Sequence, residues 1–166
     1  MSDYKRKNFM QKIPITLKGL DKLENERTKL KNEDRPKVIQ SIASARELGD
    51  LSENAEYHAA REQQGFIEGR IKELEAIISL SEAIDPTTIK NSNIVFGATV
   101  TIKDLDNDNE KTYQIVGEYE ANLELNLISF NSPLGRALIG KEIGDIIDIT
   151  TPKYSKSWEI IKIEYK

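Results

Sequence analysis

Apolar residues recur at two different spacings along this chain, and the change falls near residue 90. From residue 17 to residue 80 they recur every three or four positions, which is the period of an amphipathic helix. The apolar stripe is narrow and flanked by charges, as in the seam of a coiled coil. From residue 94 onward apolar and polar residues alternate, which is the period of a strand. The pattern predicts an α+β chain with separate helical and sheet parts.

The helical part is expected to form two helices, because Gly49 interrupts the stripe. Thr16 is a suitable N-cap for the first helix, and Pro36 lies within it, so we expect a bend or a short break there. The connection is only a few residues long, which requires the helices to run antiparallel as a hairpin. The residues expected in the seam include Ala45, Ala55, Ala59, Phe66, Ile71 and Leu74. The small ones would keep the tip of the hairpin thin.

The second part is predicted to be a mostly antiparallel sheet with one short helix. Ser132 is a suitable cap for that helix, Pro133 occupies its first turn and Gly140 follows its end. The acidic stretch 104–109 lacks the glycine and the final glutamate of a calcium-binding loop, so we interpret it as a hairpin turn. The strands are expected at 94–102, 111–116, 125–130, 146–150 and 158–165.

The domain boundaries follow from these two patterns. Residues 1–9 have no apolar period and are expected to form a disordered extension, and Met10 is an alternative start. The coiled coil is expected at 10–84, and the polar stretch 85–93 is expected to be a linker. The sheet domain then covers 94–166.

Composition excludes several classes of protein. The 24 Lys and Arg against 28 Asp and Glu give a net charge of −4, and the acidic excess lies in residues 91–166. A uniformly basic nucleic-acid binder is therefore not expected. There is no cysteine, and His58 is the single histidine, so thiolate chemistry and imidazole clusters are excluded as well. No apolar run reaches the ~20 residues of a membrane span and no signal segment is present, so we expect a cytoplasmic protein.

The end of the hairpin carries the strongest candidate chemistry. Asp50, Glu53 and Glu56 lie close together there, and carboxylate oxygens are the ligands that Mg²⁺ prefers. From spacing alone, however, a capping box is the better interpretation. In that arrangement Asp50 accepts from the helix amides and Glu53 reaches back to the cap.

Cationic and aromatic side chains flank these carboxylates. Arg46 lies one turn before Asp50, and Tyr57 and Arg61 lie one turn apart on the second helix. Such a group can hold a phosphate or stack on a base. Taken alone, ordinary surface pairing is favoured, with Arg46 paired to Asp50 and Tyr57 packed on the stem of Arg61.

One segment closely resembles a known family. Residues 45–65 read ARELGDLSENAEYHAAREQQG, which is similar to the bacterial Gre family of transcript-cleavage factors, and to its A-type members in particular. The similarity continues at 13–16 (IPIT), 95–99 (VFGAT), 131–133 (NSP) and 138–141 (LIGK). It covers the chain from Met10 to its end.

The resemblance implies an N-terminal antiparallel coiled coil and a C-terminal FKBP-like domain. In this family the sheet domain docks at the rim of the secondary channel of RNA polymerase, and the coiled coil reaches the active centre. The tip carboxylates, here Asp50 and Glu53, help to hold the second Mg²⁺ and activate water. The polymerase then cleaves its own backtracked RNA. No metal is expected on the isolated protein, because two carboxylates complete a site shared with the polymerase.

Further roles are implied residue by residue. Arg46 and Arg61 match a small basic patch that contacts the nascent RNA 3′ end, and Tyr57 matches its neighbouring aromatic residue. Ser52 departs from the lysine that is common at its position. The polymerase-docking surface matches Ser132, Pro133 and Arg136. We expect a monomer with RNA polymerase as its partner.

Two other classes of function remain as alternatives to cleavage stimulation. The first is a channel-binding regulator of RNA polymerase without cleavage activity, which the Asp50 and Glu53 pair argues against. The second is an autonomous metal nuclease, which is disfavoured because the tip offers too few metal ligands. Since the family members are accessory factors, the chain is not expected to be an enzyme itself.

Overall fold

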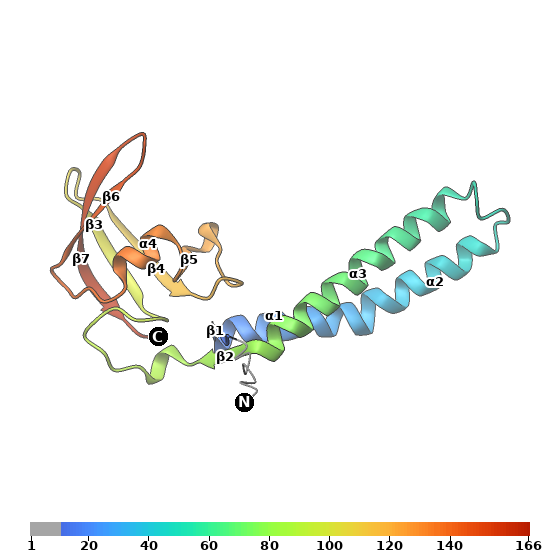
Figure 1. Cartoon of the computed structure of the whole chain (residues 1–166), viewed down its shortest axis with the longest axis horizontal. Coiled ribbons are helices and arrows are strands. Elements are labelled where there is room, and N and C mark those ends of the chain that lie inside the picture. The colour runs from blue at the N-terminus through green and yellow to red at the C-terminus, as the bar shows by residue number, and fades with distance from the viewer. Residues whose placement is uncertain (1–10) are drawn as a thin grey trace, which may run out of the picture. The chain divides into compact units, whose positions relative to one another are not determined.

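The computed structural model describes residues 11–166, and its elements are those of an α+β protein (Figure 1). The extension expected at 1–9 and the alternative start at Met10 lie outside the described residues. None of the helices formed by residues 11–166 is both long enough and apolar enough to cross a membrane.

The chain divides into two compact units at positions that differ from the boundaries expected above. Leu20–Ser81 belong to the first unit, and the second combines Ile13–Gly19 with Glu82–Lys166. Ile13–Gly19 lies with the sheet although we expected it in the coiled coil at 10–84. The physical reason is burial, since the side chain of Ile15 is almost completely removed from solvent.

A long helical hairpin forms the first unit (Figure 1). Its antiparallel limbs confirm the arrangement expected from the short connection. The period of three to four residues is kept through both limbs, so each presents one apolar stripe to the other. In order along the chain the limbs consist of α1 (Leu17–Lys29), a π-helical turn (Leu30–Asp34), α2 (Arg35–Arg46) and α3 (Ala55–Leu80).

The break expected near Pro36 is the π-helical turn that precedes α2. Proline has no backbone N–H, and its ring clashes with the carbonyl four residues earlier, here that of Asn32. The chain adopts a wider turn just before this position, in which the Arg35 N–H donates to the Leu30 carbonyl five residues back. The helix therefore continues past the proline through a local change of pitch.

The hairpin seam is apolar, but its members differ from the expected set at the α3 side. Phe66 is 71% exposed, and both Ala55 and Ala59 face solvent, so these three assignments were wrong. The reason is helical phase. Ala59 and Phe66 each directly precede a buried residue of α3, and Ala55 lies more than one turn before the first of them. Successive side chains on a helix point about 100° apart, so a shift of one residue takes a side chain out of the seam. The buried cluster consists of Val38, Ile42, Ala60, Ile67 and Ile71.

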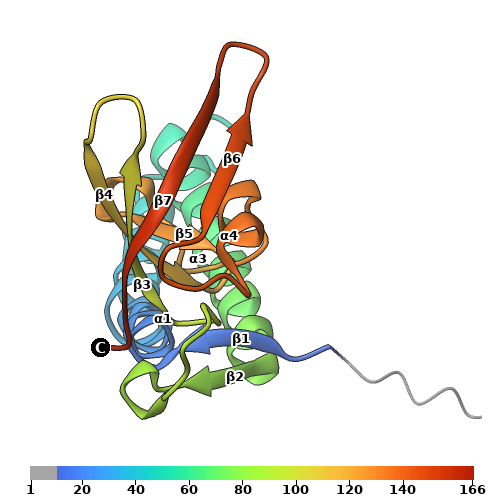
Figure 2. The same cartoon turned by 90° about the vertical axis from the view of Figure 1, so that its left-hand side faces the viewer.

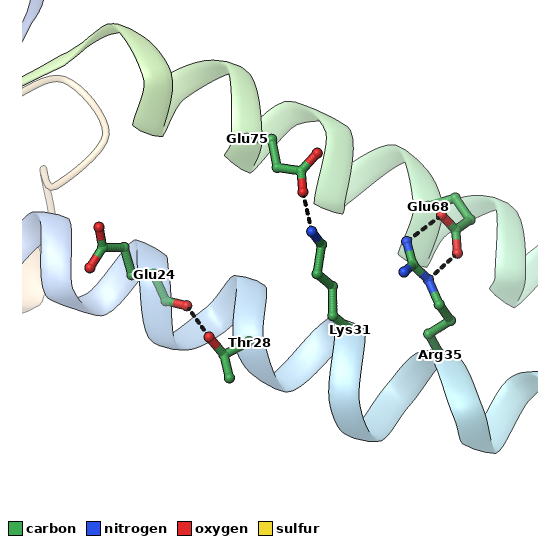
Figure 3. Close-up of polar contacts among 6 residues, drawn as sticks. All are labelled: Glu24, Thr28, Lys31, Arg35, Glu68 and Glu75. Atoms are coloured by element: carbon green, nitrogen blue, oxygen red, sulfur yellow. Dashed lines mark hydrogen bonds and ion pairs between the residues drawn. The ribbon is translucent and has the colours of Figure 1, made fainter.

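Ion pairs cross between the two limbs of the hairpin beside the seam. Figure 3 shows Lys31 and Arg35 reaching to glutamates on α3. The Arg35 guanidinium makes two bonds to its carboxylate, at 2.6 and 2.8 Å. Exposed pairs add little stability, but charges matched in antiparallel order favour one register over its slipped alternatives. The crossing pairs are Lys31 with Glu75, Arg35 with Glu68, and Arg70 with Glu26.

The second unit contains a five-stranded sheet with strand order β5-β4-β3-β7-β6 (Figure 2). All neighbouring strands are antiparallel except β4 and β5, which are parallel. The strands are β3 (Thr99–Asp104), β4 (Glu110–Val116), β5 (Leu127–Ser129), β6 (Ile146–Thr150) and β7 (Ser155–Glu164). The expected mostly antiparallel sheet is confirmed.

The core of this unit lies between the sheet and one short helix, α4 (Pro133–Leu138). The helix has the expected cap, since Ser132 Oγ accepts from the Gly135 N–H at 3.0 Å. Leu138 at its end is fully buried and packs in a cluster that includes Trp158.

A β-bulge explains an irregularity in the apolar pattern of β7. Ile102 on β3 faces Ile160, whereas the preceding Thr101 faces Lys162, so Ile161 is the extra residue. The bulge shifts the alternation by one position. This is why Trp158 and Ile160 lie on even positions while the later apolar residues of the strand lie on odd ones.

Two further strands were not predicted. β1 (Ile13–Thr16) directly precedes α1, β2 (Ser81–Ile84) directly follows α3, and they pair as a two-stranded sheet (Figure 2). Strands of this length carry too few residues for a period to be recognised. The expected cap of α1 is confirmed, since Thr16 Oγ1 accepts from the Gly19 N–H at 3.1 Å.

Two 3₁₀ turns complete the described elements. The first (Pro86–Thr88) lies in the expected linker 85–93, and Asp85 caps it. The second (Leu123–Leu125) overlaps the start of the strand expected at 125–130, which in the structure begins at Leu127.

Candidate functional site

The candidate site is the loop that joins α2 to α3 at the tip of the hairpin. α2 ends at Arg46 and α3 begins at Ala55. Gly49 has a φ of 112°, in the left-handed region that side chains rarely adopt, which lets the loop turn away from α2. Every residue from 46 to 53 is exposed, so the loop presents its side chains to a partner.

Asn54 is the true cap of α3. Its Oδ1 accepts from the Tyr57 N–H at 3.0 Å, and its Nδ2 donates to the Ala45 carbonyl at 2.6 Å. The capping box expected from Asp50 and Glu53 is therefore wrong. The helix begins only after both carboxylates, so neither can reach the positions that a capping box requires.

The Asp50 side chain accepts two hydrogen bonds from within its own loop. Its Oδ1 accepts from the Ser52 N–H at 3.0 Å and from the Ser52 hydroxyl at 2.9 Å. These two donors, the backbone one first, lower the pKa of Asp50 below that of an ordinary aspartate, because they stabilise the ionised form. Since both bonds use Oδ1, the other carboxylate oxygen carries no hydrogen bond from residues 11–166. Asp50 is thus an oriented, ionised carboxylate in water.

The carboxylate oxygens at the tip can form part of a magnesium site. Glu53 is exposed like Asp50, and hard carboxylate oxygens of this kind suit Mg²⁺, which keeps several waters and takes one or two carboxylates. Within residues 11–166 no group of three or more potential metal ligands comes together. The pair therefore fits Mg²⁺ as a contributor of ligands and not as a complete cage.

Arg46 and Tyr57 come together across the tip. The Arg46 guanidinium carbon lies 5.8 Å from the centroid of the Tyr57 ring, a cation–π distance. The rings of His58 and Tyr57 are in turn packed in a T-shaped arrangement, with 5.5 Å between their centroids. Between residues 11 and 166 the ion pairs do not include the expected Arg46–Asp50 pair, and the Arg46 guanidinium lies against the Tyr57 ring instead.

Arg61 lies farther along α3 and is exposed, as is His58. The structure brings Arg46 and Tyr57 into contact, while Arg61 is brought near only by its position on the same helix, one turn after Tyr57. With Arg46 over the Tyr57 ring, the ring can stack on a base and the guanidinium can bind a phosphate.

A second candidate surface surrounds the short helix of the sheet unit. Pro133 and Arg136 are exposed, whereas Ser132 is half-buried and caps α4. Ser132 and Pro133 line a cavity of about 460 Å³, but Arg136 does not. Trp158 and Tyr154 lie in the wall of the same cavity, so its lining is largely aromatic and aliphatic. Such a cavity can take an apolar side chain of a partner protein.

Asn54 is the residue at this site that sequence reasoning missed. The signal was present, because asparagine directly before a helix is among the best N-caps. It was hidden by Asp50 and Glu53, whose spacing matches a capping box equally well.

Comparison with known proteins establishes the family. The model described as "Transcription elongation factor, N-terminal" matches residues 13–82, and "Transcription elongation factor, GreA/GreB, C-term" matches residues 89–165. "Transcription elongation factor GreA" of Paracoccus denitrificans (strain Pd 1222) is 60% identical over 156 residues, covering 94% of this chain and 99% of that protein. The protein of that name from Rickettsia felis is 56% identical over 155 residues, covering 93% and 96%. The chain belongs to the GreA/GreB family of transcription elongation factors.

Solved structures of this kind are also similar. The GreA factor homolog 1 of Thermus thermophilus is 24% identical with a TM-score of 0.42, covering 92% of this chain and 99% of that one. The prokaryotic transcription elongation factor GreA/GreB from Nitrosomonas europaea is 21% identical with a TM-score of 0.43, covering 93% and 98%.

Proposed function

We propose that this chain stimulates the cleavage of backtracked nascent RNA by RNA polymerase, with its hairpin tip entering the secondary channel. A transcription elongation factor of the GreA/GreB family is an accessory factor, and the polymerase is the enzyme. The observation that carries the proposal is the exposed pair Asp50 and Glu53 at the end of the helical hairpin, where Asp50 is ionised and held by Ser52.

The tip carboxylates serve as metal ligands for the active centre of the polymerase. Asp50 and Glu53 would hold a Mg²⁺ ion together with ligands that the polymerase and the RNA phosphate supply. When bound, such an ion lowers the pKa of its water and stabilises the charge that develops on phosphate oxygens. Asp50 is ionised at neutral pH, as an aspartate normally is, and the bonds from Ser52 that lower its pKa favour the same form, so no proton has to leave when the complex forms.

Arg46, Tyr57 and Arg61 hold the RNA 3′ end beside these carboxylates. Arg46 lies over the Tyr57 ring, which restricts the guanidinium, and guanidinium N–H groups bond phosphate oxygens well. The ring provides a flat surface for an unstacked base. Because Ser52 is neutral and its hydroxyl is occupied by Asp50, it adds no cationic contact of its own.

The sheet unit docks on the polymerase. Ser132, Pro133 and Arg136 lie on or beside α4, and the apolar cavity next to them offers a place for a side chain of the larger protein. The acidic excess of this unit suits contact with protein rather than with nucleic acid. The factor acts as a monomer in the cytoplasm, where transcription takes place.

A transcript-cleavage assay on a stalled, backtracked polymerase complex tests the proposal. Wild type is expected to shorten the labelled RNA, whereas Asp50→Ala and Glu53→Ala bind the polymerase and lose at least tenfold in cleavage rate. Glu62→Ala is the matched control, because Glu62 is an exposed carboxylate on α3 away from the tip. Its rate is expected to match wild type.

Three results would contradict the proposal. Wild-type rates from both tip variants would remove the role of the carboxylates. Polymerase binding without any stimulation of cleavage would instead make the chain a channel-binding regulator. RNA hydrolysis by the isolated protein with Mg²⁺ would make it a nuclease.

A further inference from the structure

Asn54 joins the two helices of the hairpin at the point where they end. One side-chain amide caps α3 through its oxygen and reaches the last turn of α2 through its nitrogen, at 2.6 Å from the Ala45 carbonyl. The Ala45 side chain is 2% exposed, so the carbonyl belongs to the buried seam rather than to the exposed loop. The Asn54 side chain is therefore a strut across the hairpin.

The strut satisfies the Tyr57 N–H in the first turn of α3 and gives the Ala45 carbonyl a second donor, because that carbonyl also accepts from the Leu48 N–H at 3.2 Å. Helix geometry leaves the first N–H groups of α3 without partners in the helix. A neutral hydrogen bond contributes little by itself, but losing one partner leaves the other group desolvated at a cost. The strut is thus favoured over an open tip.

Few other contacts hold the loop between the two helices. Within the described residues, the loop hydrogen bonds that reach α3 or its cap are those of Asn54 and a 3.3 Å contact between His58 Nε2 and the Ser52 carbonyl. The remaining bonds run back to α2, from Leu48 to Ala45 and from Gly49 to Arg46. The Asn54 amide therefore supplies the side-chain hydrogen bond that spans the two helix ends, beside the Arg46–Tyr57 contact and the packing of Tyr57 on the seam.

We propose that Asn54 is a positioning residue for transcript cleavage, because its strut sets where Asp50 and Glu53 lie relative to the helix ends. The inference rests on the proposed function. Asn54 touches neither metal nor RNA in this scheme. It acts by limiting how far the carboxylate-bearing loop can shift, and a displacement of about 1 Å at a catalytic group can cost a large factor in rate.

Two substitutions separate the strut from the cap. Asn54→Ser keeps a good neutral N-cap, but serine is too short to reach the Ala45 carbonyl. Asn54→Asp keeps an N-cap that the helix dipole favours and replaces the donor by an oxygen that cannot bond a carbonyl. Asn54→Ser is therefore expected to keep the helical circular dichroism and the melting temperature close to wild type, because the Leu48 N–H still bonds the Ala45 carbonyl. Asn54→Asp should keep the helix but melt somewhat lower, because its carboxylate oxygen repels that carbonyl.

The decisive measurement is the cleavage rate as a function of factor concentration. Both variants are expected to lower the rate at saturating factor by about tenfold, while the concentration that gives half of that rate stays at the wild-type value. Loss of a merely structural contact would change the half-saturating concentration or the melting temperature instead. Asn25→Ser is the matched control, because Asn25 is an exposed asparagine on α1 whose Nδ2 bonds Asp21 at 3.2 Å.

The result can overturn the inference without touching the proposed function. A wild-type saturating rate in either Asn54 variant, with Asp50→Ala inactive in the same assay, would show that the strut does not position the carboxylates. A change confined to the half-saturating concentration would also overturn it. If Asp50→Ala itself cleaved at the wild-type rate, the proposed function would fail first.

Discussion

The carboxylate of Glu120 holds the segment that leads into α1. It accepts from the Thr16 N–H at 3.0 Å and from the Thr16 hydroxyl, and also from the Gly117 N–H at 2.7 Å. The space is closely filled, since a Cβ on Gly117 would lie 2.4 Å from the Pro14 carbonyl oxygen. One side chain thus ties β1 to the end of β4, within a single unit of the protein.

Removing this carboxylate is expected to destabilise the sheet unit. Glu120→Ala leaves two backbone N–H groups without an acceptor, and bonds to a charged acceptor are worth about 1.5–3 kcal/mol each. Because Glu120 is only half-buried, water replaces part of these bonds, so we expect a loss of about 2 kcal/mol rather than the full sum. Urea unfolding followed by the fluorescence of Trp158, the single tryptophan, measures it. The exposed neighbour Glu118→Ala should unfold like wild type. Equal midpoints for the two variants would show that the tie contributes nothing.

Asp104 should make the stability of the sheet unit depend on acid pH. It is 1% exposed, and it accepts from the Asp106 N–H at 2.9 Å and from Lys156 Nζ at 3.0 Å. These donors lower the pKa of Asp104. A carboxyl pKa that folding lowers stabilises the folded state above the unfolded value of about 4, and that stabilisation disappears as the pH falls through the folded pKa.

The corresponding variant is Asp104→Asn. It is expected to have a lower urea midpoint than wild type at pH 7, and the difference should shrink below about pH 4, because the carboxyl of the unfolded wild type is protonated there first and that of the folded state only at lower pH. Asp106→Asn, at an exposed position in the same turn, serves as the control. A difference that stays constant from pH 7 to pH 3 would contradict the assignment.

The structure of the hairpin seam predicts a large loss of stability at one apolar residue of α3 and almost none at another. Ile71 is 3% exposed and packs in the seam, so Ile71→Ala should cost about 2–5 kcal/mol. Phe66→Ala should change stability by less than about 0.5 kcal/mol, because the ring is already in water. Circular dichroism of the helices during urea unfolding measures both. A large loss for Phe66→Ala would mean that a partner covers it in solution.

The Arg46–Tyr57 contact should be visible in cleavage kinetics. Tyr57→Phe keeps the ring and should act like wild type, whereas Tyr57→Leu removes it. An exposed cation–π contact is worth about 0.5–1 kcal/mol, so Tyr57→Leu should lower stimulated cleavage about two- to fivefold. In an Arg46→Ala background the same change should have a smaller effect. Fully multiplicative losses would show that the two residues act independently.

Much of the fold could be read from local patterns, because those patterns are themselves local physics. The strand at Ile146–Thr150 and the capped helix at Pro133–Leu138 lie within the spans expected for them, and Pro36 adjoins a break in the helix as expected. Each depends on neighbouring residues alone. The strand follows from alternating apolar residues, the helix from a serine oxygen that caps its first N–H groups, and the break from the N–H that proline lacks. The short strand at Ser81–Ile84 was not predicted, because it forms by pairing with β1, which is distant in the sequence.

The candidate site shows the same division. The residue types at the tip, and their resemblance to a known family, identified Asp50 and Glu53 as its carboxylates. Their spacing suggested a capping box, and only the position at which α3 begins assigned the cap to Asn54 instead. The reason is that several local hydrogen-bonding schemes fit one spacing, and the packing of α3 against α2 selects among them.

The amino-acid order thus specified two long apolar periods, a turn at Gly49 and a carboxylate-bearing tip, since these follow from helix geometry and residue chemistry. Tertiary structure decided that Phe66 faces water while Ala60 is buried, and that the Asn54 amide spans the two helices to Ala45. Those outcomes depend on the register between two antiparallel limbs. Residues far apart in the chain set that register together, so no local window contains it.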